Sequence, residues 1–427
     1  MNLKNKLTNK KYRLLQNSYD RTSVRFSKDK LKEMTTNQGD SFQLEVIENG
    51  NLGYSSYNQP DEDVLIEKAI HASQYGDKVT YDYPKKESLK NVKLYDAETA
   101  KFNPQEAIKL GNYFIKSLKE VDPNILVDVH IDASTDLFAL DQSSGVSENL
   151  KASAFSVYVE GELTKKGDIM GIGQYYGWRK NELDKKKFIT SLKEKFTLSQ
   201  TFAKTTGGSM TILFAPEVVD TLFEFFETAL SGESIYKKVS KWQDSLEKQV
   251  ADLRFTMIDD PLIDFALGSS PIDDEGHSIE KMPLIENGIL KNYILDLKNA
   301  TRLNMKPNGR GFGLPASPST TNIVVNPGTK SKDQIIKSIK KGILVDQIIG
   351  GGQDNPYAGD FTYNIHLGFL IENGEIIGRV KNCVVSGNIF EMIKTQIAEI
   401  SSDCEWYGGS KNLPYIAFEN MNIVTQK

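Results

Sequence analysis

Three side chains that can ligate a metal ion alternate along one short segment. Asp128, His130 and Asp132 occupy every second position, and the residues between them are apolar. Because side chains alternate between the two faces of a strand, all three are expected on one face, and zinc accepts both carboxylate and imidazole ligands. A metal site also needs a pocket, whereas antiparallel sheets routinely expose one polar face to water. We therefore favour a solvent-facing sheet surface over a metal site.

A second acidic group, Asp273-Asp274-Glu275, directly precedes Gly276 and His277. Its spacing is not that of an EF-hand loop, and acidic turn residues mostly accept hydrogen bonds from nearby backbone N–H groups. We therefore predict a tight turn in which His277 is exposed.

The glycine run at 350–352 lacks the Gly-Lys-Ser/Thr ending of a phosphate-binding loop. It favours a backbone that passes close to another strand or to an extended peptide.

The cysteines and histidines do not form a recognisable catalytic or metal-binding pattern. Cys383 and Cys404 lack the short paired spacing of a structural zinc site, and Cys404 is expected to be a small apolar residue rather than a ligand. The four histidines are scattered along the chain. No Gly-x-Ser-x-Gly segment marks a serine nucleophile, so no catalytic triad can be chosen from the sequence.

The most informative element is the segment from residue 207 to residue 234. The apolar run 210–215 predicts a buried strand, and Pro216 stands where a helix can begin without a backbone N–H. A helix is then expected to about residue 230, with Gly232 as its stop. Its apolar side chains fall on one stripe, and Glu217, Thr221, Glu224 and Thr228 line the opposite side. On this reading Glu224 is a charged residue on the polar face of an amphipathic helix.

The elements around this segment predict an α+β fold with two domains. We place the boundary near Thr206, which gives an α/β domain with a mainly antiparallel sheet at 1–206 and a β-rich domain at 207–427. Strands are expected over much of 19–59 and 127–160, and hairpins turn at Asn287-Gly288 and Asn373-Gly374. Further helices are expected over 61–74, from 103 to the break at 122, and over 184–204, 240–253, 332–341 and 389–400.

Composition limits the classes of function. The chain has 427 residues, 39% of them hydrophobic and 26% charged, as in ordinary soluble proteins. Its net charge of -5 gives no electrostatic reason to expect a nucleic-acid partner. No apolar run approaches the roughly 20 residues that cross a bilayer, and the first residues have no apolar signal core. With only two cysteines, a cytoplasmic protein with free thiols is the simplest expectation.

Six short segments together resemble the TldD/PmbA family, also called the modulator of DNA gyrase family. They are 273–276, 284–291, 359–361, 371–376, 385–388 and Asp403 with Pro414. The likeness covers nearly the whole chain. It implies an α/β N-terminal domain, a β-rich C-terminal domain and a dimer around an enclosed cavity. In this family a TldD-type and a PmbA-type subunit pair to form a metalloprotease for peptides, and the zinc is held by the TldD-type subunit.

The same resemblance places the family's metal motif on the predicted helix. If 229–233 is aligned with the family's Ala-Leu-Glu-Gly-Asp, the motif His-Glu-x-x-x-His falls on 223–228. Phe223 and Thr228 then replace the two histidines, and only Glu224 remains. A phenyl ring cannot ligate zinc, and a neutral hydroxyl is a poor substitute for imidazole. The resemblance is therefore to the PmbA-type branch, and Glu224 would have no zinc-bound water to activate as a general base.

The resulting hypothesis is a non-catalytic subunit of a cytoplasmic peptidase that helps to form the substrate cavity. It predicts no metal or cofactor in this chain, zinc in a TldD-type partner, a peptide substrate, and dimerisation with that partner or with a second copy. Direct contact with nucleic acid or membrane is not expected. Two alternatives remain open: a stand-alone peptidase whose metal site has moved to Asp128, His130, Asp132 or the cysteines, and a homodimeric scaffold that binds peptides.

Overall fold

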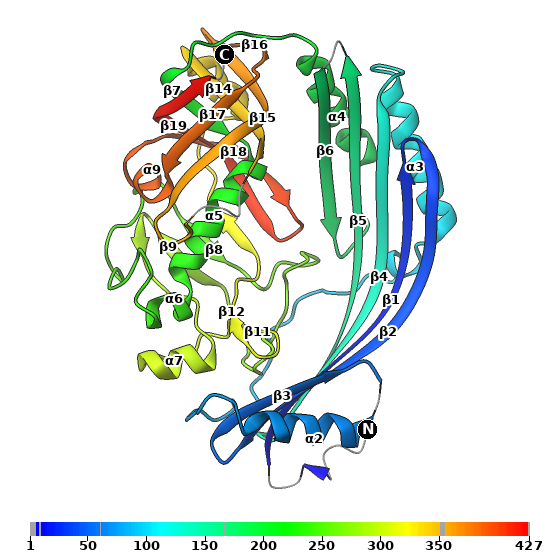
Figure 1. Cartoon of the computed structure of the whole chain (residues 1–427), viewed down its shortest axis with the longest axis vertical. Coiled ribbons are helices and arrows are strands. Elements are labelled where there is room, and N and C mark those ends of the chain that lie inside the picture. Colours follow the sequence, from blue (N-terminus) through cyan, green and yellow to red (C-terminus); the bar gives the residue numbers. More distant parts are fainter. Residues whose placement is uncertain (1–5, 8–9, 60, 166–167, 351–354, 426–427) are drawn as a thin grey trace.

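The computed structural model describes residues 6–7, 10–59, 61–165, 168–350 and 355–425, and contains two large β-sheets with helices packed against them (Figure 1). This is the predicted α+β fold with a mainly antiparallel sheet in the N-terminal part and a strand-rich C-terminal part. The glycine run at 350–352 lies largely outside the described residues.

The first sheet is antiparallel and has the strand order β3-β2-β1-β4-β5-β6. Several of its strands are unusually long, and β4, in the region where strands were predicted, has 17 residues. Inward and outward positions alternate along β4 and β5, as expected for a sheet with one covered face. The strands are β1 Lys11–Ser27, β2 Lys30–Glu48, β3 Asn51–Tyr57, β4 Leu126–Gln142, β5 Ser147–Lys165 and β6 Asp168–Trp178.

Helices cover this sheet in two places. α2 (Glu62–Ser73) packs on β3, and α3 (Pro104–Lys119) and α4 (Lys185–Ser199) share one hydrophobic cluster with β4 and β5. Asn103 and Glu106 form a capping box before α3, which satisfies the free N–H groups of its first turn. Asp184 caps α4 in a similar way by accepting hydrogen bonds from the backbone N–H groups of Lys186 and Lys187.

The second sheet has eleven strands and carries the segment that the sequence singled out. Its main path is β10-β9-β8-β13-β19-β17-β15-β14-β7, with β16 on β15 and β18 on β19. The strands are β7 Gly208–Phe214, β8 Met257–Asp259, β9 Met282–Glu286, β10 Ile289–Leu290, β13 Ile323–Val325, β14 Lys341–Ile349, β15 Asp360–Glu372, β16 Glu375–Arg379, β17 Cys383–Asn388, β18 Ile397–Tyr407 and β19 Lys411–Thr425; β11 Gly311–Phe312 and β12 Ser317–Pro318 form a separate ribbon.

Strand β7 explains how the two parts of the chain are joined. Its side chains alternate, so Ile212 and Phe214 pack into the core around α5 (Pro216–Leu230), whereas Leu213 lies in the cluster that contains Phe196 of α4 and Val159 of β5. One hydrophobic cluster therefore contains residues of both sheets. The boundary near residue 206 remains a prediction, although each sheet is built from strands on one side of it.

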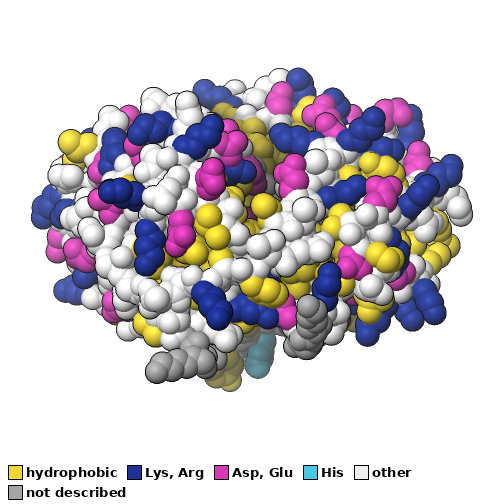
Figure 2. All heavy atoms as spheres, turned by 90° about the horizontal axis from the view of Figure 1, so that it is seen from above, with side chains coloured by type: hydrophobic (Ala, Val, Ile, Leu, Met, Phe, Trp, Pro, Cys, Tyr) yellow, Lys and Arg dark blue, Asp and Glu magenta, His cyan; other side chains and the backbone are white. Residues whose placement is uncertain are grey.

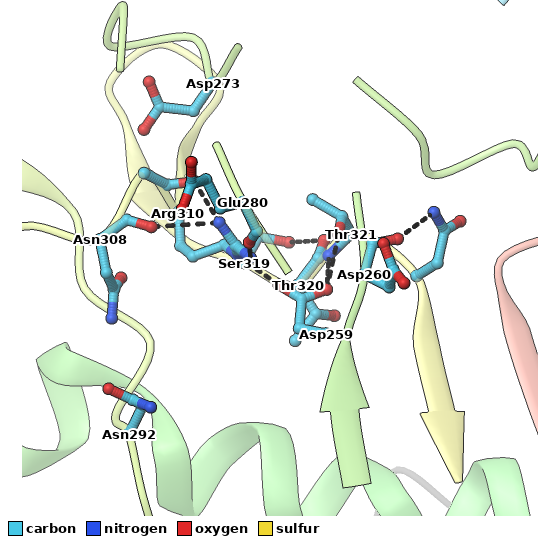
Figure 3. Close-up of polar contacts among 12 residues, drawn as sticks. Asp259, Asp260, Asp273, Glu280, Asn292, Asn308, Arg310, Ser319, Thr320 and Thr321 are labelled. Carbon is cyan, nitrogen blue, oxygen red and sulfur yellow. Dashed lines mark hydrogen bonds and ion pairs between the residues drawn. The ribbon is translucent and has the colours of Figure 1, made fainter. Parts of the chain in front are cut away.

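Buried charge orders the irregular segment from residue 301 to residue 327. The guanidinium group of Arg310 pairs with Asp259, and neither side chain is exposed. Arg310 also donates to the backbone carbonyls of Asn308 and Glu280, and Asp259 accepts from the backbone N–H and hydroxyl of Thr321 (Figure 3). Because a buried charge is costly unless it is paired and hydrogen-bonded, this network fixes the loop.

Short helices complete the structure, and several helices differ from the predictions. The helix predicted over 184–204 ends at Ser199, and the one predicted over 332–341 ends at Ser338. The segment 240–253 forms turns instead of a helix. Gly232 is the first residue of a further short helix, α6, instead of a residue that stops the helix before it. The helix that begins at residue 389 ends at Thr395 because strand β18 follows. The remaining helices are α6 Gly232–Tyr236, α7 Leu297–Leu303, α8 Lys332–Ser338 and α9 Ile389–Thr395. Among the described helices, none combines the length and the apolar character needed to cross a membrane.

Candidate functional site

The polar face of α5 is the candidate site. The helix begins at Pro216 as predicted, and its apolar face is buried in the C-terminal core. Glu217, Asp220, Glu224 and Glu227 are spaced by three, four and three residues, so their side chains line one stripe. The sequence pattern placed Glu217 and Glu224 on this face of the helix, but Asp220 and Glu227 were not predicted there.

One lysine from the last strand joins this acidic stripe. Nζ of Lys411 lies 2.7 Å from Oδ1 of Asp220 and 3.0 Å from Oε1 of Glu227. Burial by itself would lower the pKa of Lys411, but the charges of Glu227 and Asp220 outweigh it and the pKa is raised. Lys411 is therefore a cation that offsets one negative charge of the stripe.

The first carboxyl of the stripe, Glu217, is partly buried. Desolvation raises its pKa to about 7, against the opposing effect of the hydrogen bond from Gln347, and the negative charge of Asp346 adds to the rise. Nε2 of Gln347 lies 3.2 Å from Oε2 of Glu217 and 3.2 Å from the carbonyl oxygen of Gly173 in β6. Asp346 itself pairs with Lys195 of α4 at 2.8 Å. The start of α5 thus meets β6, β14 and α4.

Two tyrosines bring the stripe close to both sheets. Burial and the charges of Glu217, Asp220 and Glu224 raise the pKa of Tyr407 in β18. Burial, Glu160 and the charge of Glu217 do the same for Tyr158 in β5, whose hydroxyl donates to Oε2 of Glu160 at 3.2 Å. Seen from above, the surface is hollowed between the two halves of the molecule, with acidic and hydrophobic side chains in and around the hollow (Figure 2).

The three residues aligned with the metal motif do not converge. Phe223 is 2% exposed and packs in the core against Phe226 and Phe255, with ring centroids 5.0 and 5.8 Å apart. Glu224 is exposed on the polar face, and the hydroxyl of Thr228 donates to the carbonyl oxygen of Glu224 at 3.1 Å. Zinc needs nitrogen, sulfur or carboxylate ligands around one point. This trio supplies one carboxylate and does not fit the ion.

The comparison with family models decides the family. The PmbA/TldA metallopeptidase C-terminal domain matches residues 207–425, more than half of the chain, and domain 1 of the same family matches residues 14–73. The chain belongs to the PmbA/TldD metallopeptidase family. The predicted resemblance to this family is therefore confirmed. The candidate helix α5 and its partner Lys411 both lie within the region matched by the C-terminal domain.

Individual relatives of this PmbA/TldD member agree in sequence and in fold. An uncharacterized protein of Methanocaldococcus jannaschii is 27% identical over 83% of each chain. A metalloprotease TldD homolog of Buchnera aphidicola is 33% identical, over 50% of this chain and 44% of the relative. The crystal structure of TldE from Thermococcus kodakarensis has the same fold, with a TM-score of 0.90, 22% identity, and 97% and 96% of the two chains covered.

The other predicted candidates of this family member lie in separate places. Asp128, His130 and Asp132 sit partly exposed along β4, and the ring of His130 contacts Tyr158 at 6.3 Å between centroids. Cys383 is buried in β17 and Cys404 is half-buried in β18, both with free thiols. Within the described part of the chain, the group of side chains close enough to hold a metal ion is Asp273, Glu275 and His277, which includes none of them.

The acidic turn is confirmed as a capping structure, but its exposure was predicted wrongly. Oδ1 of Asp273 accepts from the backbone N–H groups of Glu275 and His277, and Oδ2 accepts from that of Gly311. Asp273 and Glu275 are buried, and the His277 side chain is only 15% exposed, with Nδ1 3.6 Å from Asp273. Arg13 and Gln142 donate to backbone carbonyls of this turn, and Gly311 and Gly313 donate to its aspartates, and no local pattern could indicate such distant contacts.

Proposed function

We propose that this chain is a non-catalytic subunit of a PmbA/TldD-type peptidase. The observation that carries the proposal is the placement of Phe223: its side chain is buried in the core, and no histidine stands beside Glu224 on the polar face of α5. Without a metal-bound water, Glu224 has no acidic proton to remove as a general base. The zinc and the hydrolytic step then belong to a TldD-type partner that pairs with this chain.

In this proposal the polar face of α5 shapes the wall of a peptide cavity. Asp220, Glu224 and Glu227 share one ammonium partner, Lys411, so the stripe keeps a surplus of negative charge even where Glu217 is protonated. Such a surface favours basic or N-terminal groups of a peptide and disfavours acidic ones. The free thiols of Cys383 and Cys404 support a cytoplasmic setting, where cysteines remain reduced.

Metal analysis and a peptidase assay test the proposal together. The chain purified without chelators is expected to hold no stoichiometric zinc and to cleave no unfolded peptide. Cleavage is expected when the TldD-type homologue from the same organism is added, and size-exclusion chromatography should then show a complex of the two. The Glu224→Gln variant should still support cleavage in that complex, with at most a weaker preference for basic peptides, because it removes one charge of the cavity wall but no catalytic base.

Three results would overturn or redirect it. Stoichiometric zinc in the lone chain, together with cleavage that Glu224→Gln abolishes, contradicts a non-catalytic role. Zinc and cleavage that depend on Asp128 or His130 would favour the stand-alone peptidase with a relocated metal site. A stable homodimer that binds peptides and never associates with a TldD-type homologue would favour the scaffold.

A further inference from the structure

A second enclosed site lies where the two parts of the chain meet, away from the polar face of α5. A cavity of about 210 Å³ is bounded on one side by Glu45 of β2 and Leu52 of β3, and on the other by helix α7 and residues 315–318, which include β12. These elements lie next to one another at the lower end of the molecule (Figure 1). The walls combine acidic side chains with apolar surface from Leu52, Pro315 and Pro318.

Three of the residues that line this cavity carry buried acceptor atoms. Asp296 is 1% exposed, and its Oδ2 has no hydrogen-bond partner among the described residues, although its Oδ1 accepts from the backbone N–H of Asn299. Asn299 is 3% exposed, and its Oδ1 has no hydrogen-bond partner among the same residues. Glu275 is 3% exposed and accepts from the backbone N–H of Leu297 through Oε2. Buried polar atoms without partners are rare because they cost free energy.

The cations near the cavity are bound to other groups. Arg13 pairs with Glu45 at 2.8 Å and donates to the carbonyl oxygen of Asp274. Lys298 and Arg302, at the edge of the cavity, are both directed to Asp77, at 2.6 and 3.5 Å. The carboxyl groups of Glu275 and Asp296 therefore share the cavity without an ion pair of their own in the contacts that the structure describes, and burial raises the pKa of both.

We propose that this cavity binds a primary ammonium group carried on a short aliphatic stem. An ammonium group has three N–H donors and no acceptor, and the cavity offers three acceptor groups in Asp296, Asn299 and Glu275. The apolar wall would contact the stem. A single divalent ion fits less well, because calcium takes six to eight oxygen ligands at short range and the cavity is larger than one ion requires. The inference does not depend on whether this chain is a catalytic or a non-catalytic subunit.

Isothermal titration calorimetry of the full chain with n-butylamine, alaninamide and calcium chloride tests the proposal. Saturable binding of an amine at one site is expected. Asp296→Asn removes the charge but keeps a side chain that can cap α7, and it should weaken amine binding by roughly tenfold or more, as for a lost charged hydrogen bond. Tighter binding of alaninamide indicates a peptide amino terminus as the natural ligand, and tighter binding of n-butylamine indicates a small free amine.

Two further variants keep the result interpretable. Glu247→Gln removes an exposed charge that pairs with Lys291 and does not line the cavity, so it should leave amine binding almost unchanged. Ala316→Leu fills the cavity from its apolar wall and should abolish amine binding even if Asp296→Asn fails to fold. The proposal is overturned if neither amine binds, if Asp296→Asn or Ala316→Leu binds amines as the unchanged chain does, or if calcium binds and the amines do not.

Discussion

Nζ of Lys411, at the start of the last strand, lies 2.7 Å from Oδ1 of Asp220 in the middle of α5. The two residues are separated by nearly two hundred positions in the sequence, yet together with Glu227 they connect the candidate helix to the strand on which it packs. This pair holds the acidic face of α5 in place. In the described contacts, Glu224 has no lysine as close to it as Lys411 is to Asp220.

Replacing Lys411 with methionine is expected to destabilise the fold. The substitution keeps the aliphatic stem but leaves Asp220 and Glu227 as partly buried carboxylates without a counter-charge. Because the pair is only partly buried, we expect the free energy of unfolding to fall by about 1–3 kcal/mol, measured by urea denaturation. Lys237→Met is the matched control, since Lys237 and Glu233 form an exposed pair and should contribute nothing measurable. Equal effects of both substitutions would contradict the structural role of Lys411.

Stability should depend on pH through Glu217. Its pKa is about 7 in the folded chain and near its ordinary lower value in the unfolded chain. The folded state therefore binds the extra proton between these two values, and the free energy of unfolding falls as pH rises through that interval. Glu217→Gln should remove this decline and leave the variant more stable than the unchanged chain at about pH 8, by on the order of 2–3 kcal/mol.

A series of denaturation curves from about pH 5 to about pH 8 measures this difference. The gap between Glu217→Gln and the unchanged chain should widen with rising pH. The exposed Glu286, replaced in the same way, should give a gap that stays constant. A constant gap for Glu217→Gln would show that this carboxyl titrates normally and that burial does not hold its proton.

Histidines introduced at the two positions of α5 that align with the metal motif should differ in their effect on stability. Phe223→His places a polar ring in the core against Phe226 and Phe255 and should cost about 2–4 kcal/mol of stability. Thr228→His changes a residue on the polar face and should be nearly neutral. The double variant is expected to bind no stoichiometric zinc, because one ring faces the core and the other does not. Tight zinc binding by the double variant would show that the helix can turn both positions to one site.

Local sequence patterns predicted the elements but not all of their limits. The apolar run before Pro216 and the stripe after it predicted β7 and α5, and Asn103-Pro104 predicted the start of α3, because strand runs and caps are local signals. The prediction of a helix over 240–253 was wrong, although Trp242, Leu246 and Val250 are spaced as on one face of a helix. There, Asp244 and Glu247 adopt positive φ angles, and the backbone N–H groups of Glu247 and Val250 donate to the 288–290 turn.

The sequence by itself determined the family, the α+β character and the amphipathic helix that carries Glu224, because these depend on residue types and short spacings. The tertiary structure alone decided what surrounds that helix: Lys411 beside Asp220, Gln347 beside Glu217, and the acceptors of Asp296 and Asn299 around one cavity. Each of these relationships joins residues from elements that meet only when the chain folds. The burial that shifts the pKa of Glu217 likewise arises from packing and has no local sequence signal.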